Sequence, residues 1–145
     1  MRAQTALMVL IVAAGFADSG WPDELVWSGR VAGTLLITLG IVVVLEAWRQ
    51  LGPAATPLPK PREGGALVDS GLYGYVRHPI YGAGIVAGIG YSLLTTSWPS
   101  LALTAVLAAL WELKSRREEA WLIERYPGYD AYRGRTRRKF VPFVY

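Results

Sequence analysis

The sequence of 145 residues contains no cysteine and one histidine. The absence of cysteine excludes disulfide bonds and thiolate zinc sites, and a single histidine excludes a metal cage built from several imidazoles. Charge is also missing over a long stretch, because the chain between Arg77 and Glu112 has no acidic or basic residue apart from His78. We therefore expect no bound metal, and we expect function to centre on His78 at the edge of this uncharged run.

Apolar residues make up 52% of the chain, which is typical of a membrane protein. The length suits one compact unit, so we predict a single membrane domain over residues 1–145. The formal net charge of +4 is carried by basic residues that flank the apolar segments. This pattern favours anionic lipid headgroups as partners and disfavours nucleic acid.

The uncharged segments predict an all-α, polytopic membrane protein with about four transmembrane helices. They cover residues 3–17, residues 31–45 and the run after Arg77, which the polar turn at residues 95–100 divides into a tight helical hairpin. Fifteen helical residues span about 22 Å, less than the roughly 30 Å of a bilayer core, so flanking residues must lengthen each helix. The first segment also resembles a cleaved signal peptide, although its single arginine favours a retained span.

Prolines and basic residues divide the domain further. Residues 1–48 are expected to form two N-terminal helices, residues 49–77 an irregular cytosolic loop, and residues 78–145 a helical hairpin with a cytosolic C-terminal helix and tail. The segment from Arg49 to Arg77 holds four basic residues, and the chain after Trp111 holds nine. By the positive-inside rule, both termini are expected to be cytoplasmic.

Tryptophans and small residues predict how the helices lie. Trp98 and Trp111 fall at the two ends of the fourth segment, where an indole prefers the headgroup level. Gly84 and Gly88 are four residues apart on one helix face, which allows another backbone to approach closely. Ala83 and Ala87, and Ala105 and Ala109, repeat this spacing.

One motif carries more information than the rest. The sequence from Gly71 to Tyr81 reads GLYGYVRHPIY, a glycine-rich hairpin follows, and Glu118-Glu119 lies just beyond it. This combination resembles the isoprenylcysteine carboxyl methyltransferase family and its phospholipid methyltransferase relatives over roughly residues 50–145. The resemblance implies an integral-membrane enzyme that uses S-adenosyl-L-methionine without a Rossmann fold.

The resemblance also implies which residues form the site. The positions that match the family's cofactor-binding residues are Leu67, Val68, Tyr73, Arg77, His78, Pro79, Tyr81 and Glu118. The positions expected to be catalytic are Lys114, Glu118 and Glu119. Lys114 falls where the family often has an arginine, and a lysine lacks the planar fork for bidentate binding of a carboxylate.

The residue types suit this cofactor, which offers an ammonium, a carboxylate, an adenine ring and a sulfonium. We expect methyl transfer to a lipid-like acceptor, and the resemblance favours the carboxylate of an isoprenylcysteine-type substrate as the family's leading example. Such a carboxylate is already ionised near neutral pH and needs no base. A phospholipid amine is the alternative acceptor, and it requires a base such as Glu118 or Glu119. The structural alternative for this glutamate pair is a solvated helix end, with Lys114 and Glu118 as an ordinary ion pair.

Two features leave other functions open. Glu46 adjoins an apolar run, and a carboxylate inside a four-helix bundle would suit a small membrane transporter, although an interfacial position is favoured. The tail carries the basic residues Arg133, Arg135, Arg137, Arg138 and Lys139 followed by aromatic residues. It is typical of a surface anchor on anionic lipid, and it also suits a segment that closes over the cofactor.

Overall fold

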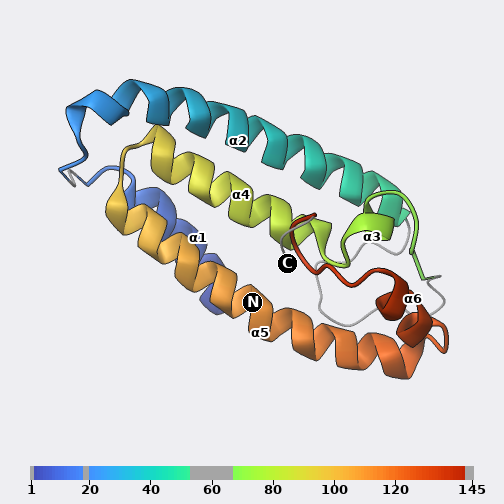
Figure 1. The fold of residues 1–145 in the computed structure, drawn as a ribbon. Helices are drawn as coiled ribbons and strands as arrows, with labels where there is room; N and C mark the ends of the chain where they lie inside the picture. Colours follow the sequence, from blue (N-terminus) through green and yellow to red (C-terminus); the bar gives the residue numbers. More distant parts are fainter. Residues whose placement is uncertain (1, 18–19, 53–66, 143–145) are drawn as a thin grey trace. The chain divides into compact units, whose positions relative to one another are not determined.

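Helices form all the regular secondary structure in residues 2–17, 20–52 and 67–142, the part of the chain that this computed structural model describes. Figure 1 shows the helices in order. They are α1 (Arg2–Ala14), α2 (Asp23–Leu51), α3 (Leu72–Tyr75), α4 (Pro79–Leu94), α5 (Trp98–Arg125) and α6 (Tyr129–Arg135). The all-α class is therefore confirmed.

Helix α2 is the helix in these described ranges that is long and apolar enough to cross a membrane. Its 29 residues begin with Asp23 and Glu24 and end near Arg49, so its charges complement the helix dipole. Helices α1 and α4 are apolar but have 13 and 16 residues. One candidate span is thus found, and the expected four transmembrane helices remain a prediction.

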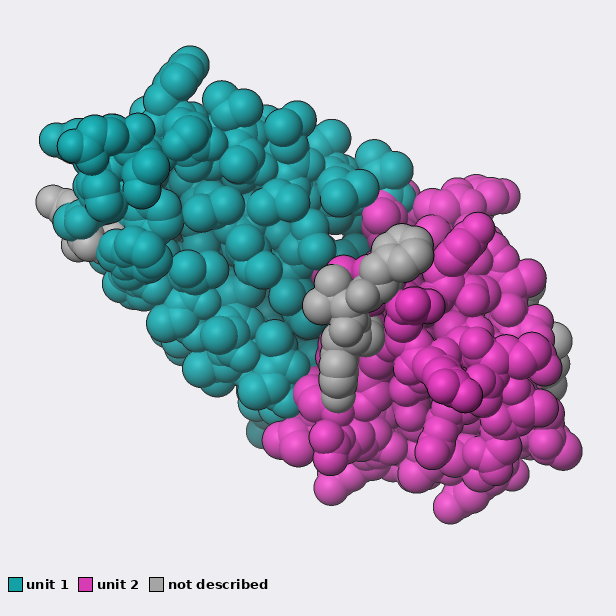
Figure 2. All heavy atoms as spheres, viewed as in Figure 1, with its two compact units in different colours: residues 1–42, 83–111 teal, residues 43–82, 112–145 magenta. Residues whose placement is uncertain are grey.

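The chain divides into two compact units, drawn in different colours in Figure 2. Unit 1 holds Met1–Val42 and Ala83–Trp111, and unit 2 holds Val43–Gly82 and Glu112–Tyr145. Each unit combines segments that are distant in the sequence. Unit 1 contains α1, the first part of α2, most of α4 and the first half of α5. Unit 2 contains the histidine motif at residues 71–81, the glutamate pair and the basic tail.

Small residues let three helices of unit 1 pack closely, as the sequence predicts. A Cβ atom added at Gly84 would lie 2.5 Å from the Trp111 ring, and one at Gly88 would lie 2.8 Å from Thr104, so both glycines face α5. A Cβ atom at Gly40 in α2 would lie 2.8 Å from the Cβ atom of Ala87 in α4, so these two helices pack closely side by side (Figure 1). Helix α4 is therefore packed on both sides through its glycine and alanine faces.

The two tryptophans at the ends of the fourth uncharged segment differ in exposure. Trp98 is 48% exposed, and its ring is tilted by 30° against that of Trp21 with centroids 4.2 Å apart, whereas Trp111 is buried. Trp111 packs into the core because Gly84 leaves room for its ring. The headgroup level that the sequence predicts for Trp111 remains a prediction, and spacing alone did not show that its ring is covered by another helix.

Helix α1 is fixed to the hairpin by side-chain hydroxyls. Ser97 Oγ donates to the carbonyl of Ala14 at 2.7 Å, and Ser100 Oγ donates to that of Ile11 at 3.2 Å. Tyr91 donates to the carbonyl of Val12 at 2.8 Å. These carbonyls lie in the last turn of α1, where the helix leaves acceptors unsatisfied. Helix α1 is therefore part of the packing of unit 1.

Candidate functional site

The histidine motif is paired with the C-terminal tail within unit 2. The backbone N–H of Arg77 donates to the carbonyl of Arg138 at 3.0 Å, and that of His78 donates to the carbonyl of Lys139 at 2.8 Å. Helix α4 then begins at Pro79, whose fixed φ suits the first helical position and which is buried. The hydrogen bonds to the tail therefore hold the backbone at His78 in place and so fix the position of its side chain.

The side chains of Arg77, His78 and Glu119 form a buried cluster. Arg77 Nε lies 2.9 Å from Glu119 Oε1, and His78 Nε2 lies 3.0 Å from the same oxygen. Their side chains are 9%, 8% and 9% exposed. Arg77 Nη1 also donates to the carbonyls of Thr136 and Arg137. The guanidinium therefore binds groups of the protein on two sides.

The electrostatics of this cluster keep Glu119 ionised. Burial by itself raises the pKa of Glu119, but the hydrogen bonds from His78 and Arg77 and the charge of Arg77 outweigh it and hold the pKa at about 2. Without these donors, burial would favour the neutral, protonated carboxyl group. The cluster is therefore an ion pair between Arg77 and Glu119, with the imidazole of His78 hydrogen-bonded to the same carboxylate.

A second group surrounds Glu118, one residue along the same helix. The Tyr81 hydroxyl lies 2.7 Å from Glu118 Oε1 and 2.9 Å from Oε2. Lys114 Nζ lies 3.8 Å from Oε1 and 5.0 Å from the centre of the Tyr81 ring. His78 Nδ1 lies 3.9 Å from Glu118 Oε2. The two neighbouring glutamates thus approach the same imidazole from opposite ring nitrogens.

Aromatic rings border this second group. The rings of His78 and Tyr81 are stacked, with centroids 5.6 Å apart and planes 5° apart. Phe140 of the tail meets both rings edge-on, at 6.1 Å from His78 and 6.4 Å from Tyr81. The structure therefore brings a cation, a carboxylate, an imidazole and two further aromatic rings together from His78, α4, α5 and the tail. Sequence reasoning assigned the tail only a general role and missed Phe140.

The remaining predicted residues, Leu67, Val68 and Tyr73, precede Arg77 in the sequence. Tyr73 is buried in α3, and its carbonyl accepts a hydrogen bond from the Tyr132 hydroxyl at 2.7 Å. Burial raises the pKa of Tyr73 and of Tyr132, so both hydroxyls stay protonated. Leu67 and Val68 are half-buried in the segment before α3. Their contact with a cofactor remains a prediction.

Glu46 has partners on its own helix. It accepts hydrogen bonds from Arg49 at 2.6 and 2.7 Å and from Gln50 at 2.6 Å. Gln50 in turn accepts a hydrogen bond from the backbone N–H of Leu72 at 2.8 Å and packs on Gly71, whose φ is 60°. Glu46 therefore helps to hold the turn that leads into α3. A carboxylate engaged in this way does not support the transporter alternative.

The tail is also tied down by charge. Lys139 is buried, and its Nζ lies 2.9 and 3.0 Å from the two oxygens of Glu112. Arg135 pairs with Asp69 at 2.9 Å. Two of the basic residues expected to anchor the tail on lipid thus also bind acidic residues of unit 2, contacts that the sequence alone did not indicate.

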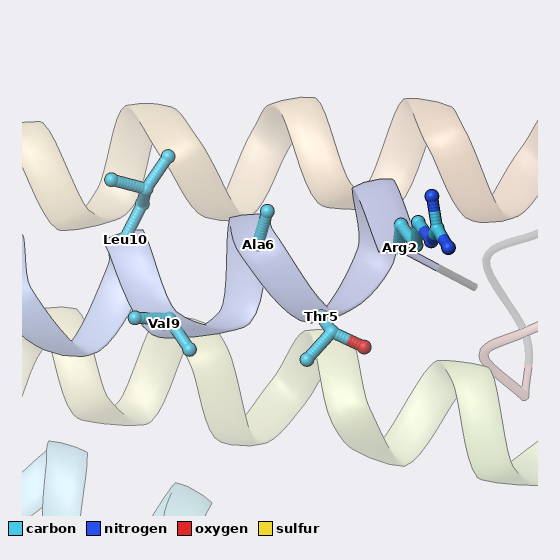
Figure 3. A pocket seen from close by; sticks show the side chains of 5 residues that line it. All are labelled: Arg2, Thr5, Ala6, Val9 and Leu10. Atoms are coloured by element: carbon cyan, nitrogen blue, oxygen red, sulfur yellow. The ribbon is translucent and has the colours of Figure 1, made fainter.

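A shallow groove lies elsewhere, on α1 in unit 1. Arg2, Thr5, Ala6, Val9 and Leu10 line it, and their side chains are mostly apolar (Figure 3). Within residues 2–17, 20–52 and 67–142, no three acidic or histidine side chains are grouped so that they could hold a metal ion. The polar cluster around His78 is therefore the candidate site.

The described residues thus combine a buried ionic cluster in unit 2 with one helix, α2, that is long and apolar enough to cross a membrane. Comparison with known proteins gives the family: the profile described as phospholipid methyltransferase matches residues 29–128. The chain belongs to this family, which is grouped with the isoprenylcysteine carboxyl methyltransferases. The match includes His78, Glu118 and Glu119 but ends before the tail.

A curated relative is the cobalt-zinc-cadmium resistance protein CzcN of Cupriavidus metallidurans. It is 33% identical over 119 residues, which cover 76% of this chain and 51% of the relative. The chain thus spans about half the length of the curated relative that it matches.

Proposed function

We propose that this protein transfers a methyl group from S-adenosyl-L-methionine to a lipid-like acceptor at the membrane. The observation that carries the proposal is the convergence of His78, Tyr81, Lys114 and Glu118 in unit 2. Membership of the phospholipid methyltransferase family supports it. The residues Leu67, Val68, Tyr73, Arg77 and Pro79 belong to the proposed cofactor site by their match to the family motif.

The chemistry of the donor set fits the cofactor. Glu118 offers a carboxylate to an ammonium, and Lys114 offers an ammonium to a carboxylate. The faces of Tyr81 and Phe140 suit a sulfonium, because a cation is attracted by an aromatic ring. When bound, S-adenosyl-L-methionine supplies a methyl group that is activated by the positive sulfur.

The protein's own contribution is then binding and alignment. Direct displacement at a methyl carbon needs the nucleophile, the carbon and the sulfur in line, and orientation supplies most of the rate gain. His78 and Glu118 are held by hydrogen bonds or aromatic contacts that keep them in place. Apolar surface on α2 and α4 suits an acceptor that arrives from the lipid phase.

The favoured acceptor is the carboxylate of an isoprenylcysteine-type substrate. Such a carboxylate is already ionised, so no base is required, and Lys114 is the cation in the site that would attract it. A phospholipid amine is the second candidate, favoured by the family description. An amine must lose a proton before it attacks, and Glu118 is the carboxylate placed to receive that proton.

Calorimetry with S-adenosyl-L-methionine tests the cofactor step on the full chain in detergent or nanodiscs. We expect binding by the wild type and binding at least about tenfold weaker in His78→Ala and Glu118→Ala. Glu124→Ala is the matched control, because Glu124 is exposed further along α5. Absence of binding by a folded wild-type protein would refute the proposal.

Radiolabelled methyl transfer then identifies the acceptor. An isoprenylated cysteine analogue and phosphatidylethanolamine vesicles are offered separately with labelled cofactor. We expect base-labile label, as in a methyl ester, in the prenylated analogue. Stable label in the phospholipid amine would instead support the second candidate, and binding without transfer to either would indicate a cofactor-binding scaffold.

A further inference from the structure

The two ring nitrogens of His78 meet different glutamates. Nε2 lies 3.0 Å from Glu119 Oε1, which is hydrogen-bond distance, whereas Nδ1 lies 3.9 Å from Glu118 Oε2, which is longer than a hydrogen bond. A neutral imidazole carries one hydrogen, on one nitrogen or the other. The environment of the ring therefore decides which nitrogen can accept a hydrogen bond from a ligand.

Glu119 can only accept hydrogen bonds. Its Oε1 already receives Arg77 Nε at 2.9 Å, and the hydrogen bonds and the charge of Arg77 outweigh burial and keep the carboxylate ionised. The nitrogen of His78 that faces this oxygen must therefore carry the hydrogen. In the neutral ring, Nδ1 is then left with its lone pair, directed towards the side of Glu118.

Arg77 fixes the position of Glu119. Arg77 holds the carboxylate through Nε, while its Nη1 donates to the carbonyls of Thr136 and Arg137 in the tail. The backbone of His78 donates to the carbonyl of Lys139 in the same tail. Both the donor and the acceptor of the His78–Glu119 hydrogen bond are thus held by one backbone segment.

We infer that Glu119 is a positioning residue, which holds His78 as the Nε2–H tautomer so that Nδ1 and Glu118 together accept hydrogen bonds from a ligand. This inference rests on the proposed function only for the ligand's place beside Glu118. It separates the glutamate pair: Glu118 meets the ligand, and Glu119 acts through the imidazole. Sequence reasoning had given both glutamates a catalytic role, since adjacent residues look alike without their partners.

Nitrogen NMR is a clean test, because His78 is the only histidine. The full chain is labelled with ¹⁵N-histidine and titrated with pH until the ring is neutral. We expect the shifts of the neutral wild-type ring to report a hydrogen on Nε2 and none on Nδ1. A neutral wild-type ring with its hydrogen on Nδ1 would overturn the inference without any variant.

Three variants separate positioning from direct contact. Glu119→Met removes the acceptor, so we expect a mixture of tautomers and binding of S-adenosyl-L-methionine weakened at least about tenfold. Glu119→Gln keeps an oxygen acceptor but no charge, so we expect it to retain the tautomer and most of the binding. Glu124→Gln, exposed on the same helix, is the control and should change neither quantity.

The outcomes also distinguish this inference from the proposed function. If Glu119→Gln keeps the tautomer but binds the cofactor as weakly as Glu119→Met, the charge of Glu119 meets the ligand and the inference is wrong. If the wild type has the Nε2–H tautomer but binds no cofactor, the proposed function fails while the role of Glu119 stands. Tryptophan fluorescence checks that each variant is folded, and the wild-type spectrum decides the tautomer even if Glu119→Met does not fold.

Discussion

Gly82, in the first turn of α4, lies directly against the carbonyl oxygen of Phe140 in the tail. A Cβ atom at this position would overlap that oxygen, so a hydrogen is the only side chain that the contact allows. The contact lies one turn after His78 and beside the ring of Phe140, which borders the site. The seating of the tail and the shape of the candidate site therefore depend on the same glycine.

We expect Gly82→Ala to displace the tail and to destabilise the fold by about 1–3 kcal/mol, the usual cost of overpacking. Because Phe140 and the backbone partner of His78 would move, cofactor binding should fall with stability. Gly134→Ala is the control, since nothing lies within 4 Å of a Cβ atom at Gly134 in α6. Thermal unfolding and calorimetry measure the two effects, and equal results for both variants would contradict the packing argument.

The Tyr81 hydroxyl gives a second prediction. It donates to Glu118 at 2.7 and 2.9 Å, so Tyr81→Phe keeps the ring but removes a donor from the carboxylate. Hydrogen bonds to charged groups contribute about 1.5–3 kcal/mol, and we expect cofactor binding about ten- to a hundredfold weaker. Calorimetry provides the measurement. Tyr75→Phe is the matched control because Tyr75 is 66% exposed, and it should bind as the wild type does.

The sequence predicted the helices and the approach of the histidine motif to the glutamate pair better than the role of each residue. The break between α4 and α5 and the glycine faces of α4 followed from proline, polar residues and spacing, which are local signals. The approach of His78 to Glu118 followed from the family resemblance. Local pattern could not indicate the backbone pairing of Arg77 and His78 with the tail, because 61 residues separate each pair.

The division of labour between Glu118 and Glu119 could not be predicted either. The two residues are adjacent on α5, so their side chains leave the helix about 100° apart and meet different partners. Which one faces Arg77 depends on how α5 is rotated against the tail. Likewise, Trp111 appears interfacial by its place in the sequence, and only the packing of Gly84 against it shows that it is buried.

The lowered pKa of Glu119 gives a prediction about how the stability of the fold depends on pH. Its pKa is lowered to about 2 from an ordinary value of 4.5, so its ionised form stabilises the folded state. For a lowered carboxyl pKa, this stabilisation is complete above about pH 4.5 and is lost as the pH falls towards 2. The shift corresponds to at most about 3 kcal/mol. Glu119→Gln should therefore lose less stability than the wild type on acidification.

Chemical denaturation at a series of pH values between 7 and 2.5 measures this difference. Glu124→Gln should follow the wild-type curve, because Glu124 is exposed and removing its charge leaves the buried cluster intact. If Glu119→Gln and the wild type lose stability in parallel, Glu119 does not contribute to the acid response.

The two hydrogen bonds of Ser97 give a prediction about the stability of unit 1. Its Oγ accepts the backbone N–H of Ser100 at 3.2 Å, as an N-cap of α5 does, and donates to the carbonyl of Ala14 at 2.7 Å. Ser97→Ala removes both interactions at a fully buried position, so we expect the free energy of unfolding to fall by about 1–2 kcal/mol.

Ser97→Thr restores the hydroxyl and should recover part of this stability. Ser28→Ala is the control, because the exposed Ser28 bonds only within its own helix. Thermal unfolding in detergent ranks the variants, and a Ser97→Ala protein as stable as Ser28→Ala would show that the hydroxyl does not hold α1 in place.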